Sequence, residues 1–218
     1  MFDEYTELCG KVRWSQAGFP QRDKCVDEEF GLTYNDVVHA RASDIKKLFE
    51  KKGWNFNEYI KIISVRNPWD RMVSLYSYQI KMGEIKGGGR GINSGGCFKH
   101  YPNNPDKETK IAAFPEFARR SIPKWQNGIV NRWNTYEMIH DEAGAPLIDY
   151  VVRLENLEED LGSIVKKHFP EFHIDYSIKQ NTSVHDHYST YYDEEAKAIV
   201  ADLLSYDIER WGYKFENE

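Results

Sequence analysis

The most informative segment of the chain is YIKIISVRNPWDRMVSLYSY, residues 59–78. Its first seven residues, YIKIISV, form a β-branched run of strand length. Asn67 is a favourable N-cap and Pro68 a favourable first helical residue, because the N–H that proline lacks has no helical partner there. Apolar residues then recur at helical spacing: Trp69, Met72, Val73, Tyr76 and Ile80. The sequence therefore predicts a strand, a tight turn and a helix, the unit from which parallel α/β sheets are built.

A second strand–helix unit is predicted downstream. IDYVVRL, residues 148–154, has the composition of a strand, and the helical stretch ENLEEDLGSIVKKHF follows it at once. Asn156 and Glu159 suit a capping arrangement, and Pro170 closes the helix. Two such units separated by helical material favour an α/β fold in which helices flank a parallel β-sheet.

The rest of the chain is predicted to be helices and loops within a single domain, residues 1–218. Residues 1–38 read as loops and short elements, and GGGRGINSGG, residues 87–96, marks a flexible excursion over about 86–106. Three helical regions are expected: one from Ser43, which caps it, to Lys52, ended by Gly53; one around 113–139, interrupted by Pro115 and Pro123; and one from Asp193 to Trp211, stopped by Gly212.

Composition limits the function classes. The 218 residues carry a net charge of −6, which argues against a nucleic-acid polymer as partner, and 14% aromatic residues exclude a disordered chain. No apolar run approaches the roughly 20 residues of a membrane span, and the acidic start lacks a signal-peptide core, so a cytoplasmic protein is expected. Three distant cysteines give no metal-ligand spacing, and His185 and His187 do not share a helix face, so no metal site is expected.

The turn after the first strand is a candidate anion site. In open α/β sheets ligands bind at the carboxyl edge, where the dipole and free N–H groups of a helix N-terminus favour an anion. Arg66, Arg71 and Ser74 lie at this turn, and a guanidinium with a hydroxyl suits a phosphate. The alternative is that the arginine pairs with Asp70 and the serine faces solvent.

Three segments in order resemble one family. They are IISVRNPWDRMVSLYSYQ, VVRLENLEEDL and NTSVHDHYSTYYDEEAKAIVADLLSYDIERWGYKF. The chain resembles sulfotransferases that use 3′-phosphoadenosine 5′-phosphosulfate (PAPS), in the carbohydrate and heparan-type group, over roughly residues 36–80 and 148–215. The resemblance implies a fold related to the P-loop kinases and transfer of a sulfuryl group from PAPS to a hydroxyl of a small-molecule or glycan acceptor.

The resemblance also implies roles for particular residues. Arg66 and Ser74 are expected to bind the 3′-phosphate of the donor, and Arg71, Asn181 and Ser183 are expected near the same cofactor.

His39 is the candidate base that takes the proton of the acceptor, because imidazole titrates near neutrality. The alternatives are that His39 is an ordinary loop histidine and that Glu155, at the end of the second strand, is the base.

One element of the family is missing from the sequence. Residues 1–38 contain no strand followed by the Lys-x-Gly-Thr/Ser type of loop that grips the phosphosulfate. Three explanations stay open: the chain begins after this loop; it grips the sulfate with other residues such as Lys11, Arg13 or Arg41; or it has kept the fold and lost catalysis. The rival function is therefore a non-catalytic nucleotide- or glycan-binding protein. A kinase-like phosphotransferase ranks last, because the chain lacks GxxxxGK[ST].

Overall fold

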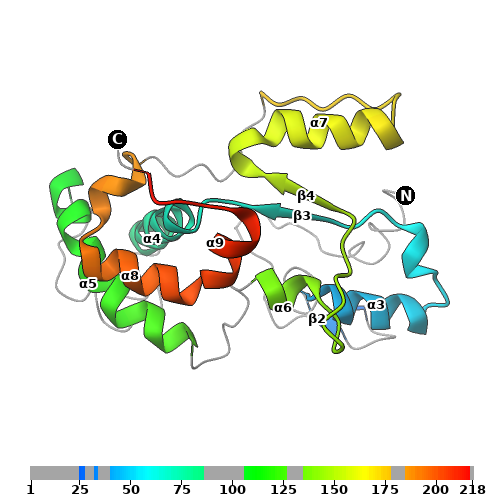
Figure 1. Ribbon diagram of the computed structural model, residues 1–218, viewed down its shortest axis with the longest axis horizontal. Helices are drawn as coiled ribbons and strands as arrows, with labels where there is room; N and C mark the ends of the chain where they lie inside the picture. The colour runs from blue at the N-terminus through cyan, green and yellow to red at the C-terminus, as the bar shows by residue number, and fades with distance from the viewer. Residues whose placement is uncertain are drawn as a thin grey trace. The chain divides into compact units, whose positions relative to one another are not determined.

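The computed structural model describes residues 25–27, 32–33, 40–85, 106–126, 135–177 and 185–216 (Figure 1). The predicted glycine-rich excursion lies outside the described residues except for Asp106. His39, Asn181 and Ser183 also lie outside them, so their placement stays a prediction. The described elements belong to two compact units, one from Met1–Ile60 and Glu137–Ile148, the other from Lys61–Tyr136 and Asp149–Glu218. The single-domain organisation likewise stays a prediction.

The first unit contains two short paired strands and a helix. Strands β1 (Cys25–Asp27) and β2 (Leu32–Thr33) are antiparallel, and helix α3 (Ala42–Lys51) is followed by the 3₁₀ turn η1 (Phe56–Glu58). A small aromatic cluster around Phe49 and Phe56 joins α3 to η1.

The limits of α3 test two of the predictions. Gly53, at φ 71°, follows the helix as predicted. The predicted Ser43 cap is wrong: the Arg41 carbonyl already accepts the first helical hydrogen bonds, so Ser43 lies inside the first turn.

The second unit contains the predicted parallel sheet. Strand β3 (Ile62–Val65) pairs in parallel with β4 (Tyr150–Arg153), with Val65 opposite Arg153. Helix α4 (Pro68–Ile85) follows β3, and α7 (Leu157–His168) follows β4 and lies alongside it (Figure 1). The mixed α/β fold predicted from the sequence is therefore confirmed.

Both strands are shorter than predicted. The first starts at Ile62 because residues 59–61 connect η1 to the strand, and the second ends in the 3₁₀ turn η3 (Leu154–Asn156). This turn also makes the predicted capping box of α7 wrong, since the Asn156 side chain makes no capping hydrogen bond. Instead the Asp160 carboxylate accepts the backbone N–H of Arg153 at 2.7 Å, which ties α7 to the end of β4.

The remaining helices differ from prediction in two places. Helix α5 (Lys107–Gln126) runs unbroken through Pro115 and Pro123, so the predicted interruptions are wrong. A proline inside a helix lacks a donor and its ring crowds the carbonyl four residues earlier, but fully buried Phe114 and Phe117 hold this helix against the core. The predicted final helix is two helices, α8 (Glu194–Leu203) and α9 (Ser205–Trp211), because Leu204 leaves helical geometry (φ −111°, ψ 27°) and inserts into the core. The short elements α6 (Thr135–Ile139) and η4 (Tyr188–Tyr191) complete the described chain.

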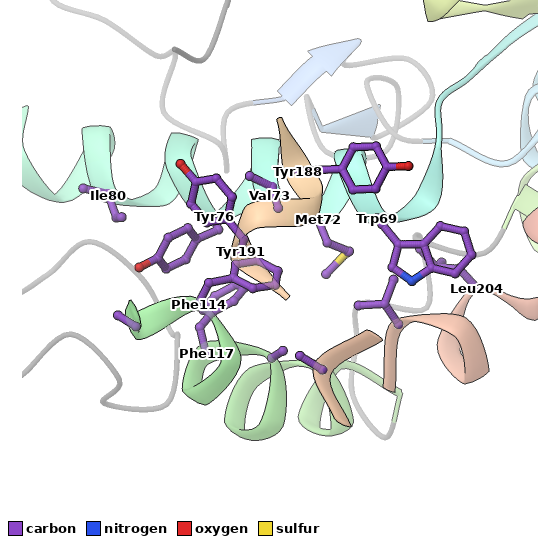
Figure 2. Packing of buried hydrophobic residues seen from close by; sticks show 14 residues of the cluster. Trp69, Met72, Val73, Tyr76, Ile80, Phe114, Phe117, Tyr188, Tyr191 and Leu204 are labelled. Carbon is purple, nitrogen blue, oxygen red and sulfur yellow. The ribbon is translucent and has the colours of Figure 1, made fainter. Parts of the chain in front are cut away.

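The core of the second unit forms around α4. Figure 2 shows the apolar stripe of this helix facing Phe114 and Phe117 of α5 and the tyrosines of η4. The residues predicted for this stripe are all buried: Trp69, Met72, Val73, Tyr76 and Ile80. Burying each such side chain contributes about 1.5–3 kcal/mol. The Tyr76 hydroxyl donates to the carbonyl of Lys110 at 2.8 Å, so its polar end is also satisfied. This packing fixes the helix whose first turn carries the candidate site.

Candidate functional site

The site is built where the two parallel strands end. Val65 and Arg153 are opposite each other at the carboxyl ends of β3 and β4. Arg66 follows the first strand and Glu155 lies in the turn after the second, so both residues lie near one edge of the sheet. This is the edge at which open α/β sheets bind ligands.

Asn67 caps α4 as predicted and also connects it to distant parts of the unit. Its Oδ1 accepts the backbone N–H groups of Trp69 (3.0 Å) and Asp70 (3.3 Å). Its Nδ2 donates to the carbonyl of Lys214 (3.2 Å) and to the hydroxyl of Tyr188 (3.4 Å). Only 6% of Asn67 is exposed. The first turn of α4 is therefore held by the C-terminal segment as well as by its own cap.

A carboxylate of the protein lies at the N-terminus of α4. Glu155 Oε1 accepts the backbone N–H of Asn67 at 2.5 Å, and its Oε2 accepts the Tyr213 hydroxyl at 3.1 Å. Burial, and then the negative charge of Glu155, raise the pKa of Tyr213. The prediction of free N–H groups at this turn is therefore wrong. The Asn67 N–H donates to Glu155, and the Trp69 N–H donates to the Asn67 side chain. Binding of an external anion at this turn therefore depends on side-chain donors.

Arg66 is the side chain best placed for such an anion. Its Nε donates to Asp70 Oδ2 at 2.5 Å, the pairing that the sequence left as an alternative. The two side chains are 26% and 22% exposed, so neither is fully solvated. Among the residues that the structure describes, the hydrogen bond of Arg66 uses Nε alone. Nε carries one of the five N–H donors of the guanidinium, and its terminal nitrogens carry the other four.

Asp70 has a second neighbour, His185. Its Oδ1 lies 3.9 Å from His185 Nε2, and the histidine side chain is only 10% exposed. The other ring nitrogen, Nδ1, lies 2.7 Å from the carbonyl oxygen of Asp186. Since a carbonyl only accepts, Nδ1 carries a proton and the ring is fixed with Nε2 toward Asp70.

Ser74 and Arg71 differ in their surroundings. Ser74 is half-buried one turn beyond Asp70, on the same face of α4 as the Arg66–Asp70 pair. Arg71 is directed toward the protein interior: burial lowers its pKa, and the nearby charge of Asp207 opposes that shift. Asp207 is itself buried and accepts the hydroxyl of Thr135. The structure therefore places Arg66 just before α4 and Ser74 two turns further along the chain, on the side of Asp70. Arg71 instead lies near the charge of Asp207.

Sequence reasoning missed several contributors to this site. The i,i+4 spacing of Arg66 and Asp70 signalled their pairing, but nothing local signalled the hydrogen bond between Tyr213 and Glu155. Those two residues are 58 positions apart. The contact of His185 with Asp70 has no sequence signal either.

The described residues also bear on metal binding and on membrane insertion. No group of three or more His, Cys, Asp or Glu side chains in these ranges is arranged to hold a metal ion. No helix within them combines the length and apolar character needed to cross a membrane.

Comparison with known proteins identifies the family. A model described as the sulfotransferase family matches residues 30–214, most of the chain. Searches of curated proteins and of solved structures gave no match. The matched range includes both strand–turn–helix units and the edge that carries Arg66 and Glu155. The chain therefore belongs to the sulfotransferase family.

Proposed function

We propose that this protein transfers a sulfuryl group from PAPS to a hydroxyl of a carbohydrate-like acceptor. Membership of the sulfotransferase family supports sulfuryl transfer in general. The observation that carries the finer proposal is the placement of Arg66 at the carboxyl end of β3, with Ser74 on the same face of the following helix. A charged fork and a hydroxyl on one face suit a phosphate ester.

The residues present fit the 3′-phosphate of such a donor. The guanidinium of Arg66 has five N–H donors, and the contact with Asp70 uses the one on Nε. The half-buried position of Arg66 strengthens its interaction with a phosphate relative to a fully solvated arginine. When bound, PAPS supplies the activated sulfuryl group. The protein's part is to orient the reactants and to stabilise developing charge.

We propose His39 as the base for the acceptor hydroxyl. Both carboxylate oxygens of Glu155 accept hydrogen bonds that hold the start of α4, which favours His39 over Glu155 for proton transfer. Asn181 and Ser183 are proposed to contact PAPS, the sulfuryl donor, as well. Arg71 is proposed to support the first turn of α4 from the side on which the charge of Asp207 lies.

Calorimetric titration with adenosine 3′,5′-bisphosphate tests the nucleotide site. The wild-type protein is expected to bind, and Arg66→Ala to weaken binding at least about tenfold, as expected for loss of a charge-assisted contact. Arg120→Ala is the matched control, because Arg120 pairs with Glu116 on α5 at the same i,i+4 spacing. No binding to folded wild-type protein at millimolar ligand overturns the proposed function.

Turnover of labelled PAPS over a panel of hydroxyl acceptors tests catalysis separately. His39→Ala is expected to lose about 10²–10⁴-fold in rate, the usual contribution of a general base. Equal rates for the variant and the wild type remove His39 from this role. Tight nucleotide binding without turnover on any acceptor favours the rival function, a sulfotransferase-like binding protein.

A further inference from the structure

We infer that Asp70 is a positioning residue that orients Arg66 and thereby gives the site its selectivity for a nucleotide with a 3′-phosphate. This inference rests on the proposed function. It concerns a carboxylate that the sequence indicates only as a competing partner of the arginine.

The contact geometry gives Asp70 this role. Asp70 holds Arg66 through Nε, at the side of the guanidinium, at 2.5 Å. Its own backbone N–H donates to Asn67 Oδ1, so the carboxylate projects from a capped and buried turn. Because the guanidinium is planar and rigid, holding it at Nε fixes the direction of the fork that its two terminal nitrogens form. That fork matches two oxygens of one phosphate group.

His185 lies on the other side of Asp70. The two carboxylate oxygens of Asp70 face different nitrogens, Nε of Arg66 and Nε2 of His185. The His185 ring cannot turn freely, because its Nδ1–H donates to the Asp186 carbonyl and only 10% of the side chain is exposed. The Asp70 carboxylate therefore lies between a nearly buried ring and the arginine that it holds.

Two opposite effects on anion binding follow from a carboxylate at this point. Its negative charge repels a phosphate, whereas its grip on Nε orders the arginine before the ligand arrives. The Nε–H of Arg66 donates to one oxygen of Asp70 and so offsets part of this charge, and an ordered fork loses less conformational entropy when it binds. The geometry therefore predicts that removing Asp70 weakens binding of the 3′-phosphate.

The experiment compares two nucleotides on four proteins. Adenosine 3′,5′-bisphosphate and adenosine 5′-monophosphate are titrated calorimetrically into wild type, Asp70→Ala, Asp70→Asn and Glu116→Ala. Asp70→Ala is expected to weaken the bisphosphate about tenfold and the monophosphate less than about twofold. Asp70→Asn is expected to recover most of the loss, since its amide oxygen can accept the Nε–H.

Glu116→Ala is the matched control. It removes the carboxylate of another i,i+4 arginine pair in the same unit, and it is expected to leave both affinities unchanged. Circular dichroism melts confirm that each variant is folded before titration.

The outcomes separate the inference from the function beneath it. If wild type binds the bisphosphate and Asp70→Ala binds it equally or more tightly, the inference is overturned alone. Equal loss for both nucleotides also overturns it, because a general structural defect does not discriminate between them. If folded wild type does not bind the bisphosphate, the proposed function fails and the inference fails with it.

Discussion

Replacing Asn67 by alanine is expected to destabilise the second unit strongly. The side chain caps α4 through the N–H groups of Trp69 and Asp70 and donates to the Lys214 carbonyl and the Tyr188 hydroxyl. Alanine keeps none of these four contacts.

The magnitude follows from two separate losses. Loss of an N-cap costs about 1 kcal/mol, with a range of 0.5–2. Loss of the amide donor removes the hydrogen bond to the Lys214 carbonyl, which contributes about 0.5–1.5 kcal/mol because this contact is only partly buried. The Tyr188 hydroxyl suffers less, because it still accepts the Glu216 N–H at 2.8 Å. The expected total is about 1–3 kcal/mol, a large part of the ~5–15 kcal/mol stability of a typical protein.

Urea denaturation followed by circular dichroism measures this loss. Asn67→Ser keeps an oxygen that can cap the helix but has no amide donor, so it is expected to lose about 0.5–1.5 kcal/mol. Asn156→Ala is the matched control: Asn156 is also the N-cap of a helix, but its side chain is exposed and makes no capping hydrogen bond. A loss at Asn67→Ala below about 0.5 kcal/mol, or equal to that of the control, refutes the reasoning.

Three further predictions concern the same unit. Burial, followed by the charge of Asp70, holds the pKa of Tyr192 well above its ordinary value near 10. Stability is therefore fully present below pH 10 and falls as pH rises toward the folded-state pKa. In urea titrations Tyr192→Phe should show an alkaline slope shallower by about 1.4 kcal/mol per pH unit, and an unchanged slope contradicts this. Glu155→Ala should lose about 1–3 kcal/mol in the same assay, while Glu155→Gln, whose amide oxygen can still accept the Asn67 N–H, should recover most of it; equal losses contradict a holding role. Gly212→Ala should cost about 1–2 kcal/mol in thermal melts because φ is 70° there, although its Cβ meets no atom within 4 Å; a neutral effect counts against backbone strain as the reason for glycine.

Local signals predicted the elements that carry the site. The apolar spacing of α4 identified its buried face, and Asn67 and Pro68 identified its start, because a cap and its helix are neighbours in the sequence. The same local reasoning failed where packing competed with it. Pro115 predicted a break, yet the burial of Phe114 and Phe117 holds α5 through it. Conversely, the unbroken apolar pattern of residues 193–211 did not reveal the turn at Leu204.

Among the site residues, the pairing of Arg66 with Asp70 was within reach of the sequence, since i,i+4 neighbours meet on a helix. The role of Glu155 was not. As a strand-end carboxylate it suggested a base, and only the fold shows that the Asn67 N–H and the Tyr213 hydroxyl bind its two oxygens.

Short-range periodicity and an ordered motif were enough to indicate the family, the two strand–helix units, and the positions of Arg66 just before α4 and Ser74 within it. The long-range contacts of Asn67, the residue that follows Arg66, come from the tertiary structure. Asn67 meets Glu155, Tyr188 and Lys214 across 88, 121 and 147 residues of sequence. Such contacts depend on how the parallel strands and the C-terminal segment pack together, and no local pattern encodes that packing.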